Sequence, residues 1–255
     1  MSNFKKLRVL KPEYINKNEF WIYSAGFNLE KDSNNLSRIN EELKDLKLLI
    51  KKKCRVFILT HQGDFKKKTS IHVPYLAKIL KKKLNTSVKY YSGLISINKL
   101  LILKKKINPG ELILVGNTRL LAGEQSNSSK LAKVYSILAN KLVLGGFSKA
   151  HRKNASNNAI LKYVKAFLSN GIVNELIKLD KWKKYSKKNF IFFIGGNKKE
   201  KVMIGLKYLG KKFNYIVPSG VVLNSILKAK GFQIGKSLYF KEAKIKNVIN
   251  NFLKK

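Results

Sequence analysis

Short apolar runs alternate with longer amphipathic segments along this chain, and this alternation constrains the fold more than any other feature. The runs are rich in β-branched and aromatic residues, whereas the segments between them have the apolar spacing of helices. The predicted strands are residues 20–25, 54–60, 88–92, 111–115, 141–144, 190–194 and 214–217, and the predicted helices are residues 36–52, 73–84, 95–105, 128–139, 199–209, 221–230 and 242–253. This order predicts an α/β fold with a parallel sheet and helices on both faces.

The pattern changes after residue 156. A long helical tract is predicted at about 157–184, with Gly171 as a break, before a second alternation begins. We therefore expect a first domain at 1–160, a linking helix region at 161–186 and a second domain at 187–255. The first is expected to be a parallel-sheet αβα sandwich and the second a truncated Rossmann-like domain.

Composition excludes several classes of protein. The longest apolar runs, such as residues 189–195, are too short to span a bilayer, and residues 1–14 lack the apolar core of a secretory signal. We therefore expect a cytoplasmic protein without membrane contact. Cys54 is the only cysteine, so an internal disulfide and a thiolate metal cluster are excluded. No residue is predicted to bind a metal ion directly.

The charge of the chain is extreme, with 54 basic and 14 acidic residues and a net charge of +40. A field of this size attracts polyanions such as RNA and predicts binding that weakens with salt. A very AT-rich genome is an alternative explanation, because the codons of Lys, Asn and Ile are AT-rich. That bias does not explain why Asp and Glu are so few, while the spread of lysine along the whole chain speaks against one binding segment.

Arginine is rare in this lysine-rich chain. Only Arg8, Arg38, Arg55, Arg119 and Arg152 occur. A retained arginine suggests a need for the planar guanidinium fork that binds carboxylate or phosphate.

Several polar residues follow the predicted strands, where ligands gather in parallel sheets. Asn28 follows the first strand, His61 and Gly63 the second, Asn117 and Arg119 the fourth, and His151 and Arg152 the fifth, while Arg38 lies at the start of the first helix. Each residue alone has an ordinary structural explanation, but together they predict an anion-binding site for a small molecule with a phosphate and a carboxylate.

A second candidate site follows the strand at 190–194. Gly195 and Gly196 would let the backbone approach a ligand closely, and the next helix would point its N-terminus at the same place. Lys198 and Lys201 would neutralise a polyphosphate there. The signal is weak alone, since neither G-x-x-x-x-G-K-[ST] nor G-x-G-x-x-G is present.

Several segments together resemble the phosphoglycerate kinase family, in the order of that family. Gly26–Asn28 resembles D-F-N, Asn35–Ile39 resembles D-x-x-R-I, Thr60–Phe65 resembles S-H-L-G-R-P, Pro109–Leu114 with Gly116–Arg119 and Gly123–Glu124 resembles P-G-E … E-N-x-R-F-x-x-G-E-E, Gly146–Ser156 resembles D-A-F-G-T-A-H-R-A-H-A-S, Gly195–Lys198 resembles G-G-A-K, and Leu227–Gly231 with Ile234–Leu238 resembles L-K-x-x-G … I-G-x-S-L. The resemblance covers nearly the whole chain.

The resemblance implies a first domain that binds 3-phosphoglycerate and a second that binds a nucleotide, with Mg-ATP or Mg-ADP as substrate of a glycolytic phosphoryl transfer. By the resemblance, the phosphoglycerate ligands are Asn28, Arg38, His61, Gly63, Arg119 and Arg152, the nucleotide ligands are Gly195, Gly196, Lys198 and Lys201, and the catalytic residues are Arg38 and Lys198. Closure of the two domains would bring the substrates together.

The departures from the family put its activity in doubt. Gly26 stands where the family has an aspartate that binds a substrate hydroxyl, and Asp64 replaces an arginine of the substrate site, although Lys66–Lys68 could compensate. The interval from Lys198 to Lys201 is one residue shorter than in the family. The sequence ends at Lys255, before the family's later nucleotide segments, so we expect weakened or lost activity unless a second polypeptide supplies them.

Three hypotheses remain open at this stage. The first is a shortened phosphoglycerate kinase that still transfers phosphate between ATP and 3-phosphoglycerate. The second is a non-catalytic relative that binds a phosphorylated metabolite. The third is a relative recruited as a basic RNA-binding or ribosome-binding protein.

Overall fold

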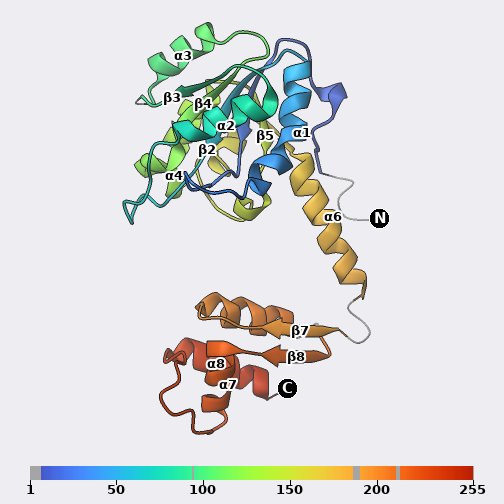
Figure 1. Ribbon diagram of the computed structural model, residues 1–255, viewed down its shortest axis with the longest axis vertical. Coiled ribbons are helices and arrows are strands. Elements are labelled where there is room, and N and C mark those ends of the chain that lie inside the picture. The colour runs from blue at the N-terminus through green and yellow to red at the C-terminus, as the bar shows by residue number, and fades with distance from the viewer. Residues whose placement is uncertain (1–6, 94, 186–189, 211–212, 255) are drawn as a thin grey trace. The chain divides into compact units, whose positions relative to one another are not determined.

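The computed structural model describes residues 7–93, 95–185, 190–210 and 213–254. The chain divides into two compact units, Met1–Leu176 and Ile177–Lys255 (Figure 1). This boundary lies within the helix of residues 170–185.

A six-stranded sheet forms the centre of the first unit. Its strands are β1 (Phe20–Ser24), β2 (Arg55–Thr60), β3 (Val88–Tyr91), β4 (Leu112–Asn117), β5 (Lys141–Leu144) and β6 (Lys165–Leu168). They lie in the order β3-β4-β2-β1-β5-β6, and every pairing is parallel. The predicted α/β fold with a parallel sheet is confirmed.

Helices and short helical turns connect these strands. Those of the first unit are η2 (Pro12–Tyr14), α1 (Ser37–Lys51), α2 (Pro74–Leu84), α3 (Ile97–Lys106), η3 (Thr118–Leu120), α4 (Ala122–Gln125), α5 (Ser129–Ser136), η4 (Phe147–Lys149), η5 (Ala159–Lys162) and the first part of α6 (Asn170–Tyr185). Across the described part of the chain, no helix has both the length and the apolar character needed to span a bilayer.

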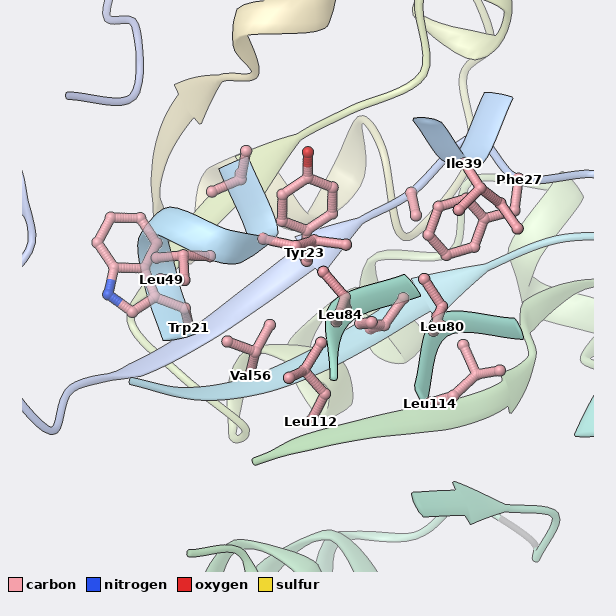
Figure 2. Packing of buried hydrophobic residues seen from close by; sticks show 14 of the residues in the cluster. Trp21, Tyr23, Phe27, Ile39, Leu49, Val56, Leu80, Leu84, Leu112 and Leu114 are labelled. Atoms are coloured by element: carbon pink, nitrogen blue, oxygen red, sulfur yellow. The ribbon is translucent and has the colours of Figure 1, made fainter. Parts of the chain in front are cut away.

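Apolar clusters cover both faces of the six-stranded sheet. On one face, side chains of α1 and α2 pack on β1, β2 and β4, and Figure 2 shows Trp21 and Tyr23 of β1 in this cluster. On the other face, Phe57 and Leu142 pack with residues of α5 and η5, among them Tyr135 and Ile160. Alternate strand residues therefore point into two separate cores.

The predicted helical tract at 157–184, and with it the linking helix region at 161–186, is wrong in its first half. Strand β6 lies in this range and pairs with β5. Its last residue, Leu168, also forms a β-bridge with Val9. Phe167 is buried with its ring centroid 5.4 Å from that of Trp21. Strand β6 has only four residues, too few for a strand pattern of alternating apolar residues to be recognised in the sequence. Its conformation is therefore decided by burial against the edge of the sheet.

The second unit contains a two-stranded parallel sheet. Strand β7 (Ile191–Ile194) pairs with β8 (Tyr215–Pro218), and the helices are the π-helix η6 (Lys201–Leu209), α7 (Gly220–Ala229) and α8 (Ala243–Leu253). The helices and strands share one apolar cluster that includes Ile194, Val202 and Ile249. Gly205 lets η6 lie close to β7, because a Cβ atom there would be 2.3 Å from Ile194 Cδ1.

Candidate functional site

The carboxyl edge of the six-stranded sheet carries the residues predicted to bind an anion. Because the strands are parallel, the segments after β1, β2, β4 and β5 leave the sheet at the same edge. These segments carry Asn28, His61, Arg119 and Arg152. Arg38 joins them from the first turn of α1.

Arg38 and Asn28 are in direct contact. The Arg38 Nη1 atom donates a hydrogen bond to the Asn28 carbonyl oxygen, at 3.1 Å. Asn28 has a φ of 30°, and asparagine tolerates such backbone better than most residues. A cavity of about 350 Å³ lies beside both residues, with Ser37 and Glu30 among its lining residues. This volume is in the range of small-molecule sites.

Arg119 and Gly63 are also in contact, since the Arg119 Nη1 atom donates a hydrogen bond to the Gly63 carbonyl oxygen. Gly63 has a φ of 73°, and a Cβ atom there would lie 2.2 Å from the Thr69 carbonyl oxygen. The buried Asn117 side chain accepts hydrogen bonds from the backbone N–H groups of Gln62 and Arg119, each at 3.1 Å. These contacts fix the segment after β2 against the end of β4.

The guanidinium of Arg119 is buried with part of its hydrogen-bonding capacity unused. Arg119 is 6% exposed, and its Nε atom has no hydrogen-bond partner among the described residues. Burial and the nearby Arg152 lower the pKa of Arg119, while Asp64 and Glu124 raise it. An orphaned buried donor destabilises a fold by about 1–3 kcal/mol, so holding Arg119 in this position has a cost in stability.

His61 is a neutral residue in a positive environment. Burial has the largest effect, and together with the positive charges of Lys149, Arg119, Arg152 and Arg38 it lowers the pKa of His61 to about 2. Three of the predicted ligands, Arg38, Arg119 and Arg152, therefore lie close enough to His61 for their charges to act on it. A neutral imidazole offers one donor and one acceptor to a ligand.

Arg152 has an anchored backbone and an exposed side chain. Its carbonyl oxygen accepts a hydrogen bond from the buried Asn157 side chain at 2.9 Å, and its N–H donates to the Lys149 carbonyl oxygen at 2.9 Å. His151 beside it is exposed. The loop therefore presents the Arg152 guanidinium to solvent from a fixed base.

Scarcity of arginine is not by itself a mark of an anion site. Arg55 lies at the first residue of β2, the opposite end of that strand from His61, and donates to the carbonyl oxygens of Asn18 at 2.8 Å and Ile107 at 3.1 Å. Arg8 lies over the Phe167 ring. A guanidinium group binds backbone carbonyls or packs on aromatic rings as readily as it binds phosphates. The position of an arginine relative to the sheet therefore predicts an anion site better than its rarity does.

Close backbone packing explains the glycine at position 26. A Cβ atom on Gly26 would lie 2.5 Å from the Gly146 Cα atom, and one on Gly146 would lie 2.4 Å from the Gly26 Cα atom. The segments after β1 and β5 therefore touch through two glycines. In this backbone no side chain fits at position 26.

Asp64 acts within its own loop. Its carboxylate accepts hydrogen bonds from Gln125 Nε2 at 2.8 Å and from the Lys67 N–H at 3.1 Å. These bonds lower the pKa of Asp64. Lys66 and Lys68 are exposed. Asp64 thus has a structural role in closing its own loop.

A buried polar network beneath the site escaped prediction. The Lys149 Nζ atom donates to Ser24 Oγ, and the Ser156 hydroxyl donates to Glu124 Oε1 at 2.6 Å. Glu42 of α1 accepts a hydrogen bond from the Tyr23 hydroxyl. Glu42 shares the apolar face of its helix with Ile39 and Leu46, which is a signal that the sequence did contain. Lys149 gave no signal, being one lysine among many.

The predicted nucleotide residues lie in the second unit, after β7. Gly196 has a φ of 102°, and a Cβ atom there would meet no other atom within 4 Å. A Cβ atom on Gly195 would lie 2.0 Å from Ser219 Oγ. Lys198 and Lys201 are exposed at the start of the helical segment. The backbone at Gly196 is thus open to a phosphate, and the lysines offer mobile point charges beside it.

No group of three or more His, Cys, Asp or Glu side chains suited to a metal ion is found among the residues that the structure describes. Divalent cations that accompany nucleotides are commonly held through the phosphates and one or two carboxylates.

Comparison with protein families gives a match over nearly the whole chain. The family described as phosphoglycerate kinase matches residues 26–255. A phosphoglycerate kinase from Legionella pneumophila (strain Lens) is 31% identical over 79% of this chain and 50% of its own length. One from Buchnera aphidicola subsp. Acyrthosiphon pisum (strain Tuc7) is 34% identical over 80% of this chain and 51% of its own length. The chain spans about half the length of these curated relatives.

Solved structures give the same result for the fold. The structure of phosphoglycerate kinase from Coxiella burnetii matches 95% of this chain and 62% of its own, with a TM-score of 0.73 and 27% identity. That of phosphoglycerate kinase from Pyrococcus horikoshii OT3 matches 98% of this chain and 65% of its own, with a TM-score of 0.78. At 20% identity, the second likeness concerns the fold alone.

Proposed function

This chain belongs to the phosphoglycerate kinase family, and from that premise we propose that it binds 3-phosphoglycerate at the carboxyl edge of its six-stranded sheet and exchanges a phosphoryl group with Mg-ATP. The observation that carries the proposal is the gathering of positive charge at this edge, where Arg38, Arg119 and Arg152 all lower the pKa of the His61 imidazole. A dianionic phosphate or a carboxylate complements such a group of charges.

Each residue of the site has a defined part in this proposal. Arg119 and Arg152 bind the ligand's anionic groups, with the buried fork fixed by Gly63 and the exposed one free to adjust. His61, neutral over the physiological pH range, donates a hydrogen bond without adding charge. Asn28 and Arg38 line the adjoining cavity. Arg38 is proposed to stabilise the charge that develops on the transferred phosphoryl group.

The nucleotide is proposed to bind in the second unit. The open backbone at Gly196 would receive a phosphate, and Lys198 and Lys201 would neutralise its charge. No protein nucleophile is required, because phosphoryl transfer depends chiefly on positioning and electrostatics. Proton transfer is not needed at the acceptor, since a carboxylate oxygen attacks the γ-phosphorus and ADP leaves.

The test is an assay of purified full chain for Mg-dependent transfer between ATP and 3-phosphoglycerate. The proposal predicts turnover that Arg38→Ala abolishes and that Arg55→Lys leaves intact. Turnover equal to a blank would contradict the catalytic part. Binding of 3-phosphoglycerate without turnover would favour the metabolite-binding hypothesis, and salt-sensitive RNA binding with neither would favour the nucleic-acid hypothesis.

A further inference from the structure

Lys149 is a buried lysine at the end of η4, immediately beneath the loop that carries Arg152. It is 3% exposed, and its Nζ atom donates a hydrogen bond to Ser24 Oγ at the carboxyl end of β1. Ser24 Oγ in turn donates to the Ser156 carbonyl oxygen at 2.8 Å. Lysine is almost never fully buried unless it is paired, so this position requires a compensating environment.

Two buried carboxyl groups supply that environment. Glu42 of α1 and Glu124 of α4 are 2% and 1% exposed. Their negative charges oppose the effect of burial on Lys149, whose pKa falls to about 8. Lys149 in turn opposes the effect of burial on both carboxyls. The ammonium is therefore charged for the most part at neutral pH. It is hydrogen-bonded to β1 through Ser24 and interacts electrostatically with the carboxyls of α1 and α4.

The charge of Lys149 also reaches the ligand site. Of the four positive charges that lower the pKa of His61, that of Lys149 has the largest effect, ahead of Arg119, Arg152 and Arg38. Lys149 and His61 are both buried, so this charge acts on the imidazole from within the protein. A charge in this low-dielectric position is screened far less than the exposed lysines of the surface.

We propose that Lys149 is a positioning residue of the anion site: its buried ammonium ties the Arg152 loop to β1 and adds fixed positive charge beneath the bound phosphate or carboxylate. The proposal rests on the proposed function only for the identity of the anion. Since Lys149 is shielded from solvent, it acts through Ser24, His61 and the loop, without touching the ligand.

This role predicts a distinctive pH dependence. A bound anion favours the charged form of Lys149, so affinity falls as pH rises through about 8. The titratable and charged groups that face Lys149 or its partners are Tyr23, Arg38, Glu42, Asp45, His61, Arg119, Glu124, Tyr135 and Arg152. Arginines stay charged in this range, and a comparison with a variant lacking the lysine isolates its contribution from that of the others.

The experiment is titration calorimetry of the full chain at pH 7.5 and pH 9.5, with 3-phosphoglycerate and separately with inorganic phosphate. Wild-type affinity is expected to fall about tenfold between the two pH values, from the Coulomb energy of a charge at an effective dielectric constant near 20. Lys149→Met should bind about tenfold more weakly at pH 7.5 and lose the pH dependence. Lys149→Arg should keep the affinity and lose the pH dependence. Lys162→Met removes the same charge from an exposed position and should follow the wild type.

Each outcome decides a separate point. Binding of 3-phosphoglycerate with an unchanged pH profile in Lys149→Met overturns the inference and leaves the proposed function standing. Phosphate binding that depends on Lys149, without 3-phosphoglycerate binding, supports the inference and overturns the proposed substrate. Binding of neither by the wild type overturns both. If Lys149→Met does not fold by near-ultraviolet circular dichroism, a wild-type pH profile in Lys149→Arg overturns the inference.

Discussion

In the first unit, apolar clusters cover both faces of a six-stranded sheet, and the polar residues at its carboxyl edge are held by hydrogen bonds. In the second unit, the described residues form one cluster, and Ile191, Phe193, Tyr215 and Val217 of the two-stranded sheet are exposed. The predicted ligands there are exposed lysines beside an open glycine. The first unit thus holds most of its predicted ligands in place, with the Arg152 side chain exposed, whereas the second offers an open backbone and exposed lysines.

The largest predicted difference between the two units is the loss of stability when a phenylalanine of the sheet is replaced by alanine. Phe57→Ala should lower the free energy of unfolding of the first unit by about 3–5 kcal/mol, because a fully buried ring leaves a cavity. Phe193→Ala, the matched change at a side chain that is 73% exposed, should stay within about 0.5 kcal/mol. Denaturant unfolding measures both. An equal loss in the two variants would show that the exposed face of β7 is covered in solution.

A second prediction concerns pH and two buried groups of the first unit. His61 has a folded pKa of about 2, below its ordinary value, so the unfolded chain binds its proton first and stability falls as pH drops below about 6.5. Glu42 has a folded pKa of about 7, above its ordinary value, so its contribution is present at low pH and lost as pH rises through 7. Between about pH 4.5 and 6.5 the two slopes have opposite sign and offset each other.

Removing either side chain should reveal the pH dependence of stability that the other one causes. His61→Gln should leave a stability that rises as pH falls through this window, and Glu42→Gln one that falls, each by about 1.4 kcal/mol per pH unit. Thermal unfolding at half-unit steps of pH measures the slopes. Variants with the wild-type slope would contradict the assigned protonation states.

A third prediction concerns the guanidinium fork. Arg119→Lys keeps the charge but loses the planar donors, and it should weaken 3-phosphoglycerate binding about 10-fold to 100-fold. Arg55→Lys is the matched control, because Arg55 bonds to backbone carbonyls at the other end of β2. The affinity of the Arg55→Lys variant for 3-phosphoglycerate should stay within about twofold of that of the wild type. Equal losses in both variants would point to a general effect on folding.

The smallest effect is expected in the second unit. Glu242→Gln breaks the exposed ion pair with Lys199, and such pairs contribute little in water. The thermal midpoint of unfolding should not change measurably. A clear decrease would show that this pair is less solvated than the structure indicates.

The sequence predicted the architecture well because the strands and helices have distinct apolar periods. Strand β5 agrees with its predicted bounds, and the other predicted strands agree to within a residue or two at each end. Strand β6 was missed, since its four residues are recognisable only by their pairing with β5. Edge strands of this kind depend on tertiary contacts that local propensity does not report.

The part of the candidate site that follows from the topology of the sheet could be predicted from the sequence. Parallel strands send their carboxyl ends to one edge, and the residues following four of them therefore met. The support beneath them was not predictable: Lys149, Glu124 and Ser156 come from separate segments and have no periodicity in common. The role of Asp64 likewise depends on Gln125, 61 residues away.

The measurement that tests the central claim most directly is a titration of the full chain with 3-phosphoglycerate, followed through the side-chain NMR signals of its three histidines. His61 lies within the proposed site, His151 adjoins Arg152, and His72 bonds to Tyr90 of β3 at 3.0 Å. The account predicts saturable shifts of the His61 and His151 signals, a small change at His72, and a neutral His61 throughout. A His61 signal unmoved at saturating ligand would contradict it.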